Sequence, residues 1–138
     1  MAKIETVWAD KYRFVNRVRG HEFVSDQPRE AGGDDAGPSP TEFLVGSLSS
    51  CIGYFVSVFL ERHDVPREGL AISIEPQYEN NPRRIAKFDV LLILPKNVPE
   101  KYHEALLRVA NTCTVHNTLL NPAQITLALQ SAPISPAA

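Results

Sequence analysis

One stretch of the chain, residues 39–63, constrains the fold more than any other and reads SPTEFLVGSLSSCIGYFVSVFLERH. Its apolar residues recur at every third or fourth position, which is the spacing of one helical face. Ser39 is a good helix N-cap, Pro40 suits the first helical position, and Glu42 completes a capping box. Because further valines widen the apolar face, the sequence predicts a central core helix with little surface exposed to water.

Length and charge set the class of protein. The chain has 138 residues and a net charge of −2, from 14 basic and 16 acidic residues. We expect one domain over residues 1–131 and a disordered tail at residues 132–138.

No basic cluster with interleaved aromatic residues is present, so no nucleic-acid partner is expected. Residues 1–20 contain no apolar signal-peptide core, which predicts a cytoplasmic protein. Ser47, Ser49 and Ser50 inside the long helix argue against a membrane span.

Alternating apolar and polar residues predict strands on both sides of the helix. A Gly/Asp/Pro-rich loop at residues 26–38 should be mobile unless something holds it. A second helix is expected over residues 99–120. The predicted strands lie at residues 3–8, 12–18, 21–25, 70–75, 85–94 and 124–130. The order βββ-α-ββ-α-β indicates an α+β fold, with a mostly antiparallel sheet packed on two central helices. The strand at residues 85–94 ends in an apolar run, so its centre should be covered on both faces.

The two cysteines, Cys51 and Cys113, lie on inward-facing stripes of the two predicted helices. No CxxC motif or Cys/His cluster is present, so no metal site and no cofactor are expected. A peroxide-reducing cysteine reacts as the thiolate, with a pKa below the free value of about 8.5. Burial raises that pKa, so a cation such as an arginine must lie near the sulfur. The residues alone permit this chemistry, and they equally permit two inert core cysteines.

The run GGDDAGPSPTEFLVGSLSSC, with a later cysteine in TCTVHNTL, resembles the OsmC/Ohr superfamily. The resemblance covers about residues 3–131 and is closer to the OsmC-like branch than to classical Ohr proteins. It implies an intertwined homodimer that acts as a thiol-dependent peroxidase on organic hydroperoxides. Cys51 matches the cysteine that attacks the peroxide and becomes a sulfenic acid, and Cys113 matches the one that resolves it as a disulfide. A small dithiol or a dihydrolipoyl protein would then reduce the disulfide.

Two positions depart from the family pattern. Classical members place a catalytic glutamate directly after the motif proline, whereas this chain has Thr41 there and its carboxylate one residue later, at Glu42. Glu42 precedes Cys51 by nine residues, about 13 Å along a straight helix and on the opposite face. A catalytic Glu42 would therefore reach the cysteine of the partner chain, and the alternative is that it only caps the helix.

The arginine that steers the thiolate has three candidates in this sequence. Arg29 precedes the GPSP motif at nearly the OsmC spacing, while Arg13 and Arg17 lie on the predicted second strand. We favour Arg29, because a loop arginine can close over a site and a strand arginine can simply face water.

The leading hypothesis is a cytoplasmic, dimeric peroxidase with redox-active cysteines. Phe43, Phe55 and Phe59 would supply an apolar pocket wall that favours organic peroxides over hydrogen peroxide. His116 lies one helical turn after Cys113 and could tune it. The main alternative is a non-catalytic binding or redox-sensing protein of the same fold with buried thiols. A purely structural dimer with core cysteines is the third possibility.

Overall fold

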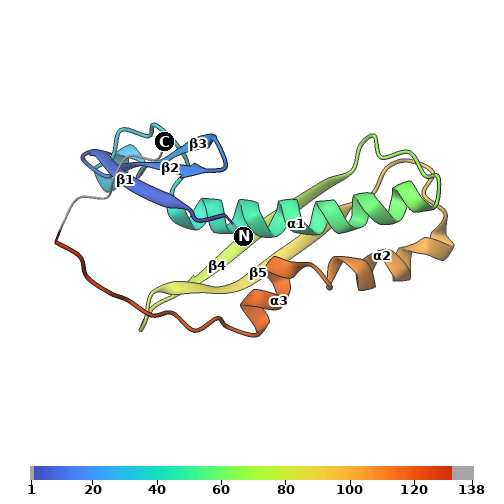
Figure 1. Cartoon of the computed structure of the whole chain (residues 1–138). Helices are drawn as coiled ribbons and strands as arrows, with labels where there is room; N and C mark the ends of the chain where they lie inside the picture. Colours follow the sequence, from blue (N-terminus) through green and yellow to red (C-terminus); the bar gives the residue numbers. More distant parts are fainter. Residues whose placement is uncertain (1, 132–138) are drawn as a thin grey trace.

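The computed structural model describes residues 2–131, in which every strand pairing is antiparallel and helices complete a mixed α+β fold (Figure 1). This confirms the predicted fold class. The strands form two separate sheets, β1-β2-β3 and β4-β5. The elements are β1 (Glu5–Asp10), β2 (Arg13–Val18), β3 (His21–Ser25), the 3-10 turn η1 (Arg29–Ala31), α1 (Pro40–Arg62), β4 (Ala71–Glu79), β5 (Arg84–Ile93), the 3-10 turn η2 (Glu100–Tyr102), α2 (His103–Ala110) and α3 (Thr114–Leu120).

The first three strands form the predicted meander. Val7 pairs with Val15, and Val15 in turn pairs with Val24 on the other side of β2. The turn between β1 and β2 is closed by Lys11, which adopts a positive φ of 46° and accepts a hydrogen bond from the indole N–H of Trp8 at 2.9 Å. This small sheet lies at the N-terminal end of α1 (Figure 1).

The long helix begins as its sequence predicts. The Ser39 hydroxyl accepts a hydrogen bond from the N–H of Glu42, and the Glu42 carboxylate accepts one from the N–H of Ser39 at 2.7 Å. Pro40 is the first helical residue. Four residues spaced one turn apart are buried against β4, α2 and α3, namely Leu48, Ile52, Val56 and Leu60. The helix therefore has one fully packed stripe.

The rest of the α1 surface is not covered by this chain, contrary to the expectation of a nearly buried helix. Tyr54 is 63% exposed and Leu44 is also exposed. By length and composition α1 is the one helix in residues 2–131 that could cross a membrane, a test that the core helices of soluble proteins also pass. The expectation was wrong for the single chain because the elements that pack on α1 reach only one side of it.

The β4–β5 hairpin runs along α1 (Figure 1), paired from Ala71–Ile93 at one end to Glu79–Arg84 at the other. β4 is longer than predicted, because its ladder continues through Pro76. The expectation that the centre of β5 is covered on both faces was wrong for the single chain: Leu91 is 62% exposed, and Ile93, on the same face of the strand, is exposed as well. One face of this two-stranded sheet packs on α1, and no element of residues 2–131 covers the other.

The predicted continuous helix over residues 99–120 was also wrong. α2 ends at Ala110, and a new helix, α3, begins at Thr114. The residues between them, Asn111 to Cys113, are poor helix formers, and Cys113 has the extended backbone of an N-cap, with φ −65° and ψ 145°. The chain therefore changes direction at the second cysteine.

The strand predicted at residues 124–130 does not form in this chain. Residues 121–131 carry no assigned helix or strand, and Ile125, Leu127 and Leu129 are 83–96% exposed. A strand needs a neighbour that supplies ladder hydrogen bonds, and no strand of the described chain pairs with this segment. The predicted disordered tail, residues 132–138, lies outside the described residues.

The capping box predicts the effect of a single substitution. Ser39→Ala removes the acceptor for the Glu42 N–H and should lower the free energy of unfolding by about 1 kcal/mol, measured by urea denaturation. Glu42→Gln is the matched control, because a glutamine amide oxygen can accept the same hydrogen bond from Ser39. Equal stability of Ser39→Ala and the wild-type protein would contradict this account of the helix start.

Candidate functional site

The second cysteine is held at a helix start rather than inside a helix. The Cys113 sulfur accepts a hydrogen bond from the backbone N–H of His116 at 3.2 Å and so caps α3. The Cys113 side chain is fully buried, with 0% exposure. His116 therefore interacts with Cys113 through its backbone N–H group and not through its imidazole ring. Its ring lines a neighbouring hollow.

The first cysteine lies beside the packed stripe of α1. Cys51 is half-buried and contacts the core cluster that contains Ile52 and Cys113. Both cysteines are free thiols, and the Cys51 side chain is a direct neighbour of the Cys113 sulfur. The fold thus brings the two predicted redox residues together, with Cys51 half-buried and Cys113 enclosed.

The surroundings of Cys113 raise the pKa of its thiol. Burial raises the pKa of the Cys113 thiol, and the neighbouring Cys51 thiol raises it further. The N–H of His116 acts in the opposite direction, because its hydrogen bond stabilises the thiolate. Since burial is the largest of these effects, Cys113 is held as the protonated thiol at neutral pH.

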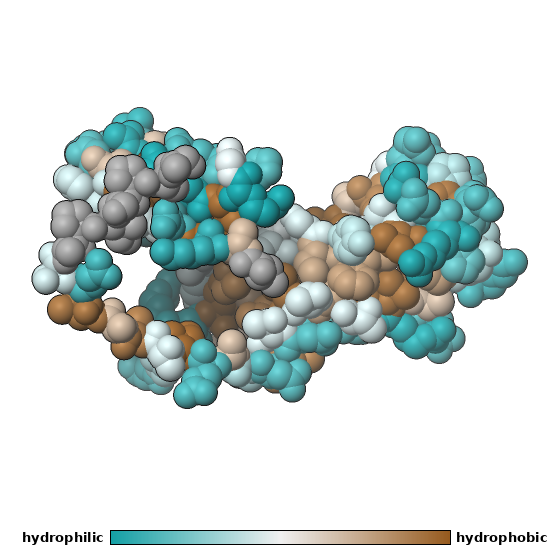
Figure 2. Space-filling model, in the orientation of Figure 1, coloured by the Kyte–Doolittle hydropathy of each residue, from teal (hydrophilic) through white to brown (hydrophobic). Residues whose placement is uncertain are grey.

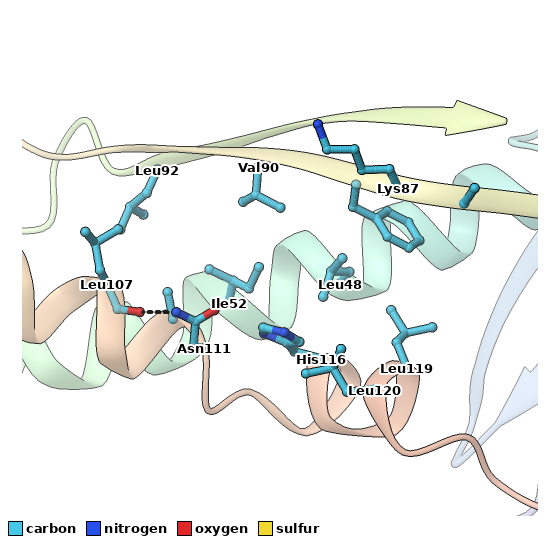
Figure 3. A pocket seen from close by; sticks show the side chains of 13 residues that line it. Leu48, Ile52, Lys87, Val90, Leu92, Leu107, Asn111, His116, Leu119 and Leu120 are labelled. Atoms are coloured by element: carbon cyan, nitrogen blue, oxygen red, sulfur yellow. Dashed lines mark hydrogen bonds between the residues drawn. The ribbon is translucent and has the colours of Figure 1, made fainter.

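An apolar hollow of about 460 Å³ lies between α1, β5, α2 and α3, and its α1 wall includes Ile52, the residue that follows Cys51 (Figure 3). Leu48 and Ile52 of α1 face Val90 and Leu92 of β5 across it, and His116 lies on its third side. Figure 2 shows apolar residues gathered over the middle of the molecule, between the N-terminal sheet and the C-terminal segment.

The phenylalanines expected to wall this pocket do not line it. Phe43 packs on Phe23 at 5.1 Å between ring centroids and lines a different hollow under the N-terminal sheet. Phe59 stacks on His63 at 4.0 Å, and Phe55 packs against the core cluster. The wall is mainly aliphatic, because the leucine and isoleucine stripe of α1 faces β5, and its aromatic members are Phe88 and His116.

Glu42 is engaged at the helix start. Its carboxylate accepts the Ser39 N–H, as described for the capping box, and no ion pair of Glu42 is found within residues 2–131. Cys51 follows it by nine residues on a regular helix, about 13 Å along the axis. Within one chain, the carboxylate therefore caps α1 and does not act on the sulfur.

The three candidate arginines differ in their partners. Arg13 pairs with Asp10 at 3.7 Å, and Arg17 pairs with Glu22 at 2.9 Å, both on the N-terminal sheet. Arg29 lies in η1, is exposed, and makes no ion pair within the described chain. No arginine of residues 2–131 donates a hydrogen bond to the Cys51 sulfur.

A buried carboxylate that the sequence analysis missed holds the loop that carries Arg29. Asp26 is 1% exposed and accepts hydrogen bonds from three backbone N–H groups of residues 27–36. The sequence carried a signal for it, because an aspartate before a glycine-rich segment commonly hydrogen-bonds the backbone that follows.

Comparisons with known proteins agree on one family. The family model for OsmC-like protein matches residues 32–128. A putative osmotic stress induced and detoxification response protein from Psychrobacter arcticus is 19% identical, with a TM-score of 0.78 over 86% of this chain and 88% of that one. An OsmC-like protein from Mycoplasma pneumoniae is 16% identical, with a TM-score of 0.73 over 88% and 89%.

A third solved structure carries a functional description. It is an organic hydroperoxide resistance protein OsmC from Legionella pneumophila, 17% identical, with a TM-score of 0.62 over 86% of this chain and 88% of that one. No curated protein sequence matches this chain. At these identities, the structural neighbours establish the fold.

The sulfur cap of α3 makes a testable prediction. Cys113→Ala removes the acceptor for the His116 N–H, so amide hydrogen exchange at His116 should be about fivefold faster, which corresponds to about 1 kcal/mol. Cys113→Ser keeps an acceptor at the N-cap and should retain more of the protection. Equal exchange rates in Cys113→Ala and the wild-type protein would show that the sulfur does not hold α3.

Proposed function

Because this chain belongs to the OsmC-like family, we propose that it is a thiol-dependent peroxidase that reduces organic hydroperoxides. The observation that carries the proposal is the pairing of a half-buried Cys51 with a fully enclosed Cys113 as free thiols. Two adjacent thiols that differ in access suit the two successive steps of such a reaction, since only one of them must meet the substrate.

The proposed reaction has three balanced steps. The Cys51 thiolate attacks the O–O bond of a hydroperoxide, forms a sulfenic acid and releases the alcohol after proton transfer. The Cys113 sulfur then attacks the Cys51 sulfur, forms the disulfide and releases water. A dithiol reductant, either a small molecule or a dihydrolipoyl protein, reduces this disulfide and becomes oxidised itself. The raised pKa of Cys113 fits the resolving role, which does not require a thiolate in the resting protein.

The apolar hollow supports a substrate with a hydrocarbon group. Leu48 and Ile52, which line it, flank Cys51 in the sequence of α1. Its wall is mainly aliphatic, and the Lys87 amine is paired with Asp89 at 2.6 Å. An alkyl or aryl hydroperoxide gains from burying its apolar group in such a space, whereas hydrogen peroxide does not.

We assign activation of the Cys51 thiolate to Arg29, because Arg13 and Arg17 are already paired with carboxylates. A guanidinium beside the sulfur stabilises the thiolate and the negative charge that develops on the peroxide oxygen. Glu42 lies too far along α1 to reach Cys51 of its own chain, so a catalytic role for it requires Cys51 of the partner subunit.

The proposal includes a homodimer. The uncovered side of α1, the outer face of β5 and the exposed segment at residues 121–131 together present a large apolar surface. Soluble monomers rarely leave surfaces of this kind open to water. A second copy of the chain would cover this surface and would also bring a second Arg29 and Glu42 toward each Cys51.

Replacement of the attacking cysteine tests the activity. The reduced wild-type protein should consume cumene hydroperoxide in the presence of a dithiol, and Cys51→Ser should lower the rate by about a thousandfold or more, because it removes the nucleophile. Cys113→Ser should still reduce one equivalent of peroxide in a single turnover and accumulate the Cys51 sulfenic acid, detected with dimedone.

The same assay separates the enzyme from its main alternative. Equal rates for the wild-type protein and Cys51→Ser would remove the peroxidase proposal and favour a binding or sensing protein with enclosed thiols. Oxidation to a disulfide in one turnover, without continued turnover when dithiol is supplied, would favour the sensing role.

The pH dependence of disulfide formation follows from the raised pKa of Cys113. With saturating hydroperoxide, the rate of Cys51–Cys113 bond formation should rise by roughly tenfold per pH unit below that pKa, because only the thiolate attacks. Stopped-flow measurements from mildly acidic to alkaline pH report this rate. A rate that does not change with pH would show that proton loss from Cys113 does not limit the resolving step.

A further inference from the structure

The loop between β3 and α1 is folded around one buried carboxylate. The Oδ1 atom of Asp26 accepts the N–H of Gln27 at 2.8 Å, and its Oδ2 atom accepts the N–H groups of Asp34 and Ala36 at 3.2 and 3.0 Å. The backbone N–H of Asp26 donates to the carbonyl oxygen of Pro38 at 3.2 Å. A single residue at the start of the loop is thereby tied to its middle and to its end.

The glycines of this loop allow its backbone to close on itself. A Cβ atom on Gly33 would lie 2.0 Å from the carbonyl oxygen of Gln27, and a Cβ on Gly37 would lie 2.3 Å from the carbonyl oxygen of Val24. No other residue fits at either position without moving the backbone. The hydrogen bonds of Asp26 and these close approaches specify the same loop conformation.

A second contact ties the loop to the N-terminal sheet. Lys11, in the turn between β1 and β2, forms an ion pair with Asp34 at 2.7 Å. The pKa of Asp26 lies below its usual value, chiefly because the backbone N–H of Ala36 stabilises the carboxylate, with smaller contributions from other N–H groups and from Arg13. Asp26 is therefore ionised at neutral pH, and each of its hydrogen bonds is charge-assisted.

Arg29 lies in the part of the loop that these contacts enclose. The carbonyl oxygen of Pro28 accepts the N–H of Ala31 at 2.9 Å, and that of Arg29 accepts the N–H of Gly32 at 3.0 Å, so the backbone around Arg29 is fixed as a 3-10 turn. Its side chain is exposed and forms no ion pair within residues 2–131. The loop thus holds an uncompensated cation on an ordered backbone.

We propose that Asp26 is a positioning residue for peroxide reduction, because its carboxylate fixes residues 26–38 in the conformation that presents the Arg29 guanidinium. This inference rests on the proposed function, in which Arg29 activates Cys51. A glycine-rich loop without the clamp would sample many conformations, and the guanidinium would occupy its productive position for only a fraction of the time. A functional group must be held within about 0.5 Å to act efficiently.

A double-mutant cycle tests the proposal. Asp26→Asn keeps the shape of the side chain but places an NH2 donor where backbone N–H groups converge. It should lower kcat/KM for cumene hydroperoxide by about tenfold in the wild-type background, as expected for the partial loss of a charged group from the site. In the Arg29→Ala background the same substitution should cause no further loss, because the group it positions is absent.

A second carboxylate of the same loop, that of Asp35, provides the control variant. Asp35→Asn replaces an exposed loop carboxylate that makes no side-chain hydrogen bond in the described chain and should leave kcat/KM unchanged. Equal losses from Asp26→Asn with and without Arg29 would show that Asp26 supports the fold in general, and would overturn the positioning role. If Asp26→Asn does not fold, Gly33→Ala disturbs the same loop through its backbone and should give the same pattern in the cycle.

A separate readout follows the loop without peroxide chemistry. Trypsin should cut after Arg29 roughly tenfold faster in Asp26→Asn than in the wild-type protein, because the released loop can enter the protease site. Unchanged cleavage would overturn the clamp itself. A wild-type protein without peroxidase activity would instead overturn the proposed function and the positioning role together, while the trypsin comparison would still show whether Asp26 holds the loop.

Discussion

The contact of one stripe of α1 with the β4–β5 hairpin and α2 organises this chain. Val56 and Leu60 are completely buried in it, as is Leu106 from α2. A helix can bury only one side against elements that approach from one direction, so within one chain the other side of α1 stays uncovered. Cys51 lies at the border between the two sides. This position gives Cys51 a packed neighbour, Cys113, and leaves Cys51 only half-buried.

Side-chain acceptors for backbone N–H groups recur where the chain changes direction around the candidate site. Ser39 caps α1, Cys113 caps α3, and Asp26 accepts three N–H groups of the loop that carries Arg29. Each acceptor satisfies donors that would otherwise lack a partner. In two of the three cases the acceptor is also tied to the proposed chemistry, since Cys113 is the proposed resolving thiol and Asp26 orders the loop of the candidate arginine.

Local patterns predicted the elements whose signals are contained in a few neighbouring residues. The N-terminal meander and the start of α1 at Ser39 are of this kind, because alternation and capping act over one to four residues. The break before Cys113 was missed because the apolar spacing of residues 99–120 continues across it, while the burial of the sulfur against α1 depends on a distant element. The strand at residues 124–130 has the right alternation, but a strand also requires an edge to pair with.

The sequence by itself determined that the chain has a long capped helix, antiparallel strands and a first cysteine, Cys51, beside the apolar stripe of that helix, since each of these follows from the spacing of residues along the chain. Only the tertiary structure decided that Cys51 and Cys113 are neighbours, that Cys113 begins a helix, and that Asp26 closes the loop around Arg29. These relations join groups that are distant in sequence or enclosed by folding. Packing and the burial of polar atoms therefore establish them, and periodicity does not.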